Sequence, residues 1–118
     1  MLMSDTMKRM AYNTEIAERL RDQLLSNATV DEKKMFGGIA FMVNGHMCVG
    51  VVEESLVVRV GAEQHDACLA LPHTRQMDFT GRPMKNFVYI DGPGFDDEAS
   101  LVEWIDRGLK FVNSLPPK

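Results

Sequence analysis

The chain has 118 residues, of which 45% are hydrophobic and 25% charged, with a formal net charge of −4 at pH 7. These totals are typical of one globular domain and exclude a chain that is disordered throughout. The acidic balance argues against direct nucleic-acid binding, and no apolar run approaches the roughly 20 residues that span a bilayer.

Residues 1–12 contain four of the nine methionines and show no hydrophobic period, so we expect a flexible tail before a single domain over 13–118. No apolar segment follows the basic pair in this tail, which argues against a signal peptide. Met10 competes with Met1 as the native start, because the first helix signal begins directly after it. With two cysteines and no export signal, we expect a cytoplasmic protein whose thiols stay reduced.

The first helix is predicted from Asn13 or Thr14, either of which is a good N-cap residue, to about Leu25. Polar residues cover one side of this segment. Apolar residues recur at helical spacing and predict its buried face: Ile16, Ala17, Leu20 and Leu24.

Residues 34–52 read KMFGGIAFMVNGHMCVGVV and predict a β-hairpin. Asn-Gly between apolar segments is the strongest short hairpin signal, so Asn44-Gly45 should form a type I′ turn with Val43 opposite His46. Gly37-Gly38 enters a strand rather than a helix, which excludes a phosphate-binding loop and favours a bulge or a close packing contact. A third strand, 55–60, should fold back after Glu53 and Glu54.

A regular register through both turns separates the side chains into two faces with a period of two. One face is apolar throughout and is the predicted core face: Ala40, Met42, Met47, Val49, Val51, Leu56, Val58 and Val60. The other is mixed: Ile39, Phe41, Val43, His46, Cys48, Gly50, Val57 and Arg59.

The mixed face has two interpretations. If helices cover only the other side, Ile39, Phe41, Val43, Val57 and Arg59 form an exposed patch, and such patches mark protein interfaces. Alternatively, a helix wraps over this face and buries it. We favour an interface, with a second copy of the chain as the partner in a homodimer.

The second half of the sequence predicts a helix over 62–71, a strand fragment at 77–79, a last strand at 86–92 and a closing helix from about Asp96. The complete order is α-β-β-β-α-β-β-α. We therefore expect one α+β domain whose antiparallel sheet has its helices packed on one face.

Four residues are weak candidates for a metal site. His46 and Cys48 alternate onto one sheet face, and His65 and Cys68 share one side of a helix. Zinc accepts these ligand types, but strong zinc signatures place their ligands in closely spaced pairs that this chain lacks. We therefore expect no metal site, and no cofactor.

Neither catalytic residues nor charged groups provide a stronger candidate for a functional site. No carboxylate pair stands out, and Cys48 beside His46 lacks an orienting acid, so we expect a protein that is not an enzyme. Arg75, Arg82 and Lys85 form a basic group, which we interpret as solvated surface rather than as a contact for an acidic partner.

The segments KKMFGGIAFMVNGHMCVGV, LVVRVG, MDFTGRPMKNFVYID and WIDRGLKFVNSLPPK resemble the TfoX (Sxy) N-terminal domain family. The resemblance runs from about Met10 to the end of the chain. Its more specific motifs are residues 35–38 (MFGG) and 81–85 (GRPMK). The family's namesake regulates natural competence in bacteria and carries a second, C-terminal domain, so we expect a stand-alone single-domain member.

The resemblance implies a small α+β fold similar to secretion chaperones, with no catalytic residue to transfer. It also implies a regulatory or adaptor domain that works through contact with a protein partner, whose identity the sequence leaves open. The alternative is a small-molecule or metal-binding domain that uses the sheet face with His46, Cys48 and Arg59.

Overall fold

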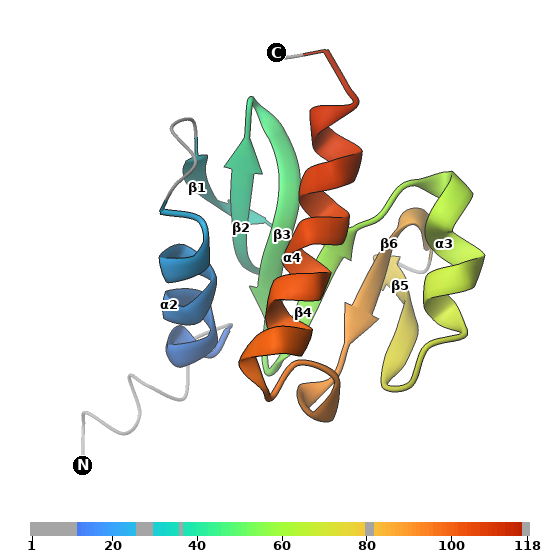
Figure 1. Cartoon of the computed structure of the whole chain (residues 1–118), viewed down its shortest axis with the longest axis horizontal. Coiled ribbons are helices and arrows are strands. Elements are labelled where there is room, and N and C mark those ends of the chain that lie inside the picture. Colours follow the sequence, from blue (N-terminus) through green and yellow to red (C-terminus); the bar gives the residue numbers. More distant parts are fainter. Residues whose placement is uncertain (1–11, 26–29, 36, 80–81, 117–118) are drawn as a thin grey trace.

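The structure is a computed structural model that describes residues 12–25, 30–35, 37–79 and 82–116 (Figure 1). Its strands are β1 (Val30–Met35), β2 (Gly38–Val43), β3 (His46–Val52), β4 (Ser55–Arg59), β5 (Thr74–Phe79) and β6 (Arg82–Ile90). Its helices are α2 (Thr14–Gln23), α3 (Ala62–Leu69), α4 (Glu98–Asn113) and the short 3₁₀ helix η1 (Gly92–Gly94). The predicted α+β class is confirmed, and the predicted elements occur in the predicted order, with β1 as one additional strand.

The six strands form one antiparallel sheet in the order β1-β2-β3-β4-β6-β5. Helix α4 lies across the middle strands, α2 lies beside it, and α3 stands at the β5–β6 end (Figure 1). All three helices contribute side chains to one large buried cluster, which we call the helix-side core. The sheet therefore presents one face to the helices, as predicted.

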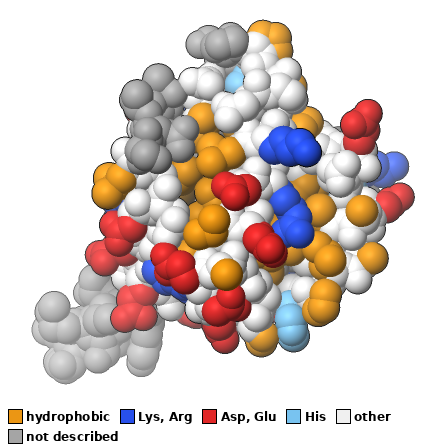
Figure 2. Space-filling model, viewed as in Figure 1, with side chains coloured by type: hydrophobic (Ala, Val, Ile, Leu, Met, Phe, Trp, Pro, Cys, Tyr) orange, Lys and Arg blue, Asp and Glu red, His pale blue; other side chains and the backbone are white. Residues whose placement is uncertain are grey.

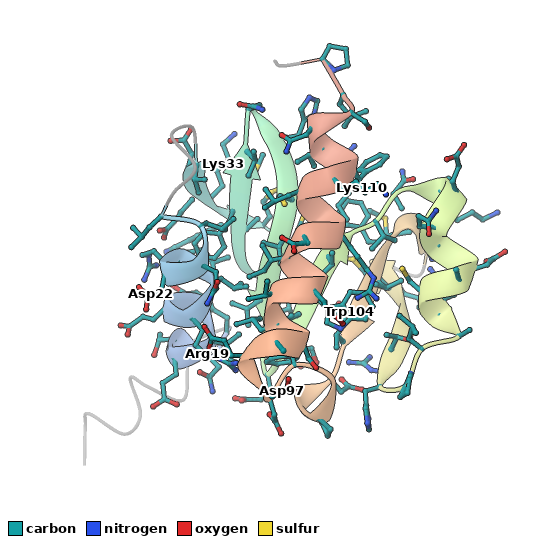
Figure 3. All side chains as sticks on the ribbon, in the orientation of Figure 1. Arg19, Asp22, Lys33, Asp97, Trp104 and Lys110 are labelled. Carbon is teal, nitrogen blue, oxygen red and sulfur yellow. The ribbon has the colours of Figure 1, made fainter. Side chains whose placement is uncertain are left out.

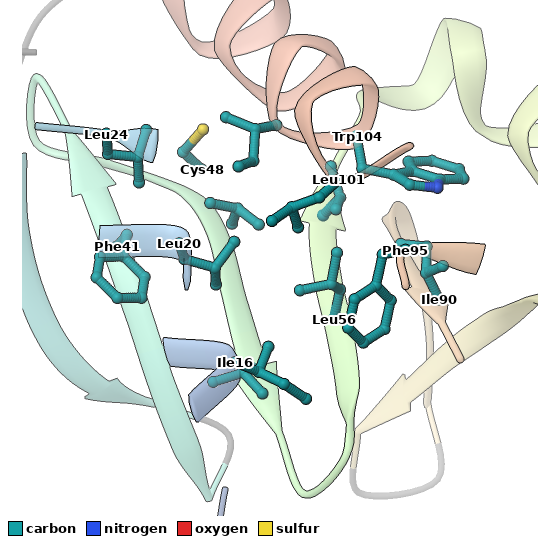
Figure 4. Close-up of a cluster of buried hydrophobic side chains, with 14 of the residues drawn as sticks. Ile16, Leu20, Leu24, Phe41, Cys48, Leu56, Ile90, Phe95, Leu101 and Trp104 are labelled. Atoms are coloured by element: carbon teal, nitrogen blue, oxygen red, sulfur yellow. The ribbon is translucent and has the colours of Figure 1, made fainter. Parts of the chain in front are cut away.

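The helix-side core joins α2 and α4 to the sheet (Figure 4). Leu20 of α2, Phe41 of β2, Leu56 of β4 and Leu101 of α4 are each fully buried in it. Burial of one such side chain contributes roughly 1.5–3 kcal/mol to folding. The core therefore fixes the position of α4 on the sheet.

A smaller cluster occupies the opposite face of the sheet, which we call the far face: Ala40, Met42, Met47, Val57, Met77 and Phe87. Strand residues alone make up this cluster, and none of its members is more than 9% exposed. Among the described residues, Leu25 is the only large hydrophobic residue that is mainly exposed to solvent, with an exposed fraction of 76%. An open apolar sheet face is therefore not found in this part of the chain.

The predicted hairpin is confirmed, but a bulge interrupts its register. Asn44 and Gly45 both have positive φ (54° and 85°), as a type I′ turn requires. Val43 pairs with His46 and Met42 with Met47, but Phe41 pairs with Val49, so Cys48 is an extra residue in β3. After such a bulge, each later side chain of the bulged strand lies on the sheet face opposite to the one that a regular register would give it.

This bulge corrects the predicted faces. Ile39, Phe41 and Val43 lie in the helix-side core with Val49 and Val51, whereas Ala40, Met42 and Met47 lie on the far face. Val57 lies on the far face as well, and is fully buried. The expected interface of Ile39, Phe41, Val43, Val57 and Arg59 is thus wrong as a shared exposed patch, because the prediction assumed a regular register.

Strand β1 was not predicted. It is an edge strand with a mostly exposed side-chain pattern, and its sequence VDEKKM has no apolar alternation. Pairing with β2 holds it in place, and Glu32 receives two hydrogen bonds from Arg21 of α2, at 2.6 and 2.8 Å. Exposed edge strands often carry such charges, which discourage pairing with other chains.

The remaining predictions differ mainly in their bounds. Asn13 caps α2 by accepting hydrogen bonds from the backbone of Glu15 and Ile16, and Asp97 caps α4 by accepting one from Ser100. Val52 pairs with Ser55, so the turn at Glu53 and Glu54 also forms. Of the expected tail 1–12, only Tyr12 is described, and it bridges to Glu53. None of the described helices is long and apolar enough to cross a membrane.

Candidate binding cleft between α3 and α4

A cleft among the described residues lies between α4 and the start of α3. It has a volume of about 680 Å³. It is lined by residues 60–64, by Asn86 of β6, and by Arg107, Lys110, Phe111 and Ser114 of α4. Strand β4 ends at Arg59 and α3 begins at Ala62, so the tight connection between them forms the floor.

Gly61 lets this connection pass very close to α4. Its φ is +87°, in the region that only glycine adopts freely. A β-carbon at this position would lie 2.5 Å from Cδ1 of Phe111. The backbone N–H groups of Val60 and Gly61 both donate to the carbonyl oxygen of Asn86, at 2.8 and 3.1 Å. Backbone pairing and close packing therefore fix the floor and one wall of the cleft.

The cleft is more basic than the chain as a whole. Arg107 and Lys110, one helical turn apart on α4, face a single lining carboxylate, that of Glu63. Neither cation forms an ion pair within the described residues. The guanidinium of Arg107 instead lies 4.4 Å from the ring centroid of Trp104, which orients it by a cation–π contact.

A second, smaller cleft of about 280 Å³ continues from Arg107 toward the start of α4. Its helix wall carries Ser100, Glu103 and Trp104, and its other walls are the loop 71–73 and residues 93–94 of η1. Both clefts run along α4, and Figure 3 labels Trp104, which lines the smaller cleft, and Lys110, which lines the larger one. In Figure 2, cationic and hydrophobic side chains lie next to one another over this part of the molecule.

Arg59 lies behind the Phe111 wall. Its guanidinium carbon is 5.4 Å from the ring centroid of Phe111 and 5.8 Å from that of Phe87. Its Nε is buried and has no hydrogen-bond partner among the described residues. The two aromatic rings therefore hold a third cation close to the cleft.

The structure does not assemble the metal candidates. Nε2 of His46 lies 2.6 Å from the carbonyl oxygen of Pro116, so this ring ties the chain end after α4 to β3. Cys48 is fully buried, and burial raises the pKa of its thiol to about 12. Cys68 lies in the helix-side core, and burial raises its pKa as well. Among the described residues no three His, Cys, Asp or Glu side chains could hold one metal ion.

His65 is the least satisfied of the predicted candidates. Its side chain is 8% exposed, and its Nε2 has no hydrogen-bond partner within the described part of the chain. Its Nδ1 lies 3.6 Å from the carboxylate of Asp66. It lines neither of the two clefts described here, so it adds nothing to the site between α3 and α4.

The predicted basic group separates into different environments. Arg75 forms an ion pair with Asp91, with 2.8 Å between its Nη2 and the carboxylate, and it stacks on Tyr89. This pair lowers the pKa of Asp91. Lys85 is exposed on β6, and the side chain of Arg82 lies outside the described part of the structure. Arg75 therefore has a structural partner and is not free to meet an acidic ligand.

Sequence reasoning missed the cleft, although one of its signals was visible. The closing helix carries Trp104, Arg107 and Phe111 at spacings of three and four, which places them on one side. A glycine directly between a strand and a helix, as at position 61, also indicates a close approach. Nothing in the spacing revealed that α3 would stand opposite this side of α4.

Comparison with known protein families identifies the chain. The family model described as the TfoX N-terminal domain matches residues 22–112, which is most of the chain. None of the curated proteins compared with the chain matches it.

Proposed function

Since the chain belongs to the TfoX N-terminal domain family, we propose that it is a cytoplasmic regulatory or adaptor module that acts by binding a partner protein. Membership of this family supports a domain that is similar to the N-terminal domain of a competence regulator. The finer proposal is that the α3–α4 side of the molecule is the contact surface, and that the domain does its work there without catalysis.

One observation carries this proposal: Arg107 lines both clefts and Phe111 the larger one, and Arg107 is stacked on Trp104, which is buried in the helix-side core and lines the smaller cleft. Tryptophan and arginine are the residue types most enriched at the energetic centres of protein interfaces, and aromatic residues in general are enriched there. Arg107 lines both clefts and is already oriented by its stacking on Trp104. Such a row loses little conformational entropy when a partner binds.

The dimensions of the surface fit a segment of a partner. The two clefts follow α4 from Ser100 to Ser114, which at 1.5 Å per residue is about 21 Å. An extended chain of roughly six residues covers that length. The exposed residues Glu103 and Lys110 at its margins give it the polar rim that interfaces commonly have.

Site-specific photo-crosslinking in the native host tests the proposal. A photoreactive amino acid replaces Lys110, and the matched control replaces Asp22, an exposed residue on α2 (Figure 3). We expect a discrete protein adduct from position 110 that is absent from position 22 and lost when Arg107→Glu is added. Adducts of equal yield from both positions, or none from position 110, would contradict the proposed contact surface.

The mass of the adduct also identifies the type of partner. An adduct at twice the mass of the chain would make a second copy the partner, in a homodimer through α4 rather than through the sheet face expected from the sequence. An adduct with another protein would favour the adaptor role. The other predicted function, ligand binding by His46, Cys48 and Arg59, is not proposed here, because Cys48 is fully buried and His46 bonds to Pro116.

A further inference from the structure

We propose that the 680 Å³ cleft between α3 and α4 binds a small organic anion, with its carboxylate or phosphate group between Arg107 and Lys110 and its apolar body against Phe111. This inference goes beyond the proposed function, because it concerns the isolated domain and needs no partner protein.

Size and surface favour a small molecule. Pockets for small ligands typically measure about 300–1,000 Å³ and combine apolar walls with a few convergent polar groups. This cleft falls in that range. Phe111 and Val60 supply apolar surface, and Asn86 and Gln64 supply neutral polar groups at its margin.

Charge determines the class of ligand. Arg107 and Lys110 have no carboxylate partner within the described residues, whereas Arg21 and Arg75 each form an ion pair. Arg59, whose guanidinium carbon lies 5.4 Å from the ring centroid of Phe111, adds positive potential next to this wall. An anion between Arg107 and Lys110 would form charge-assisted hydrogen bonds, which are roughly twice as strong as neutral ones.

The shape of the cleft is largely formed before a ligand arrives. Arg107 is stacked on Trp104, and Phe111 is packed against Gly61, where a β-carbon would collide with its ring. No side chain caps the start of α3, so acceptor groups of a ligand could also reach the first-turn N–H groups. The negative charge of Glu63 repels a bound anion and lowers its affinity. Substitution of Glu63 by a neutral residue removes this repulsion.

An NMR titration of the purified protein tests this inference. Two-dimensional amide spectra are recorded with phenyl phosphate, benzoate, inorganic phosphate and uncharged benzyl alcohol. We expect saturable shifts confined to residues 61–64, Asn86 and 107–114. At least one aromatic anion should bind more tightly than inorganic phosphate and benzyl alcohol, and comparison of phenyl phosphate with benzoate identifies the preferred charged group.

Three variants make the test specific. Replacement of both Arg107 and Lys110 by glutamine should weaken binding of the preferred probe by about tenfold or more, and Glu63→Gln should strengthen it. The matched control replaces Lys33 and Lys34 on β1, two exposed lysines away from the cleft, and should leave the affinity unchanged. Preserved dispersion of the amide spectrum shows that each variant is folded.

Several outcomes would overturn the inference. These are the absence of saturable shifts at millimolar probe, shifts at β1 as large as those in the cleft, equal affinity for benzyl alcohol, and equal weakening by the β1 control. Saturable binding of a short acidic peptide without a response to either aromatic anion would assign the cleft to a protein segment instead.

Discussion

Gly108 of α4 lies directly against Cys48 of β3. A β-carbon at position 108 would lie 3.0 Å from the carbonyl oxygen of Cys48 and 3.1 Å from its Sγ. Gly108→Ala should gain up to about 1 kcal/mol of helix propensity but lose more through this contact, since a strand carbonyl moves little. We expect a net loss of about 1 kcal/mol in the free energy of unfolding, measured by urea denaturation.

The control for this substitution is Asp106→Ala, at an exposed position two residues earlier in α4. It should change the free energy of unfolding by less than about 0.5 kcal/mol. A stabilised Gly108→Ala variant would mean that α4 can move away from β3 at no cost, which would contradict the close packing described for this contact.

Phe41 distinguishes the two assignments of the sheet faces. Because its ring is fully buried beneath α2, Phe41→Ala should lower the free energy of unfolding by about 3–5 kcal/mol, and Phe41→Glu should prevent folding. Leu25→Glu, at an exposed position, should have an effect within about 0.5 kcal/mol. A folded Phe41→Glu variant would restore the exposed-face interpretation. Circular dichroism and urea titration measure both results.

The two cysteines should be inert in the folded protein. Both thiols are buried, and the pKa of Cys48 is raised to about 12, so almost no thiolate is present or accessible at mildly alkaline pH. We expect an aromatic disulfide reagent to detect no thiol in the native protein and both thiols in concentrated guanidinium chloride. Rapid reaction of one thiol without denaturant would contradict the burial of that residue.

The Arg75–Asp91 pair should make stability depend on pH in the acid range. The hydrogen bond from Arg75 is the main cause of the lowered pKa of Asp91. A carboxyl group with a lowered pKa stabilises the folded state above its usual pKa, and this contribution is lost as the pH falls through the folded value. Asp91→Asn should therefore cost about 0.5–1 kcal/mol near neutral pH, a modest figure because the pair is partly exposed.

The same substitution should cost less in acid, so the difference between wild type and variant should shrink as the pH approaches about 2. Asp31→Asn makes the same change of charge at an exposed position on β1 and is the control. Urea denaturation at several pH values gives the comparison. A difference that stays constant with pH would mean that the ion pair does not account for the effect.

The sequence predicted those elements whose signals are local. Asn44-Gly45 specifies its own turn, Asn13 caps the helix that follows it, and the helical spacing of Ile16 and Leu20 defined the buried side of α2. These features depend on neighbours within a few residues. They were therefore visible without knowledge of the tertiary contacts.

The features that escaped prediction depend on distant contacts. β1 has no apolar pattern because it is exposed, and only its pairing with β2 makes it a strand. The cleft requires α3 and α4 to stand opposite each other, although Gly61 and Phe111 are 50 positions apart in the sequence. The predicted faces failed for a different reason, since the extra residue Cys48 leaves no mark in a run of apolar letters.

The bulge formed by that extra residue decides which side chains of β3 enter the helix-side core. A substitution at Cys48 alters one side chain, but deletion of the residue would give β2 and β3 a regular register. Phe41 would still pair with Val49, and Phe41, Val43, Val49 and Val51 would all keep their places in the helix-side core. The bulge thus corrects the phase of β3: in a regular strand with Cys48 retained, Val49 and Val51 would point to the face opposite Phe41 and Val43.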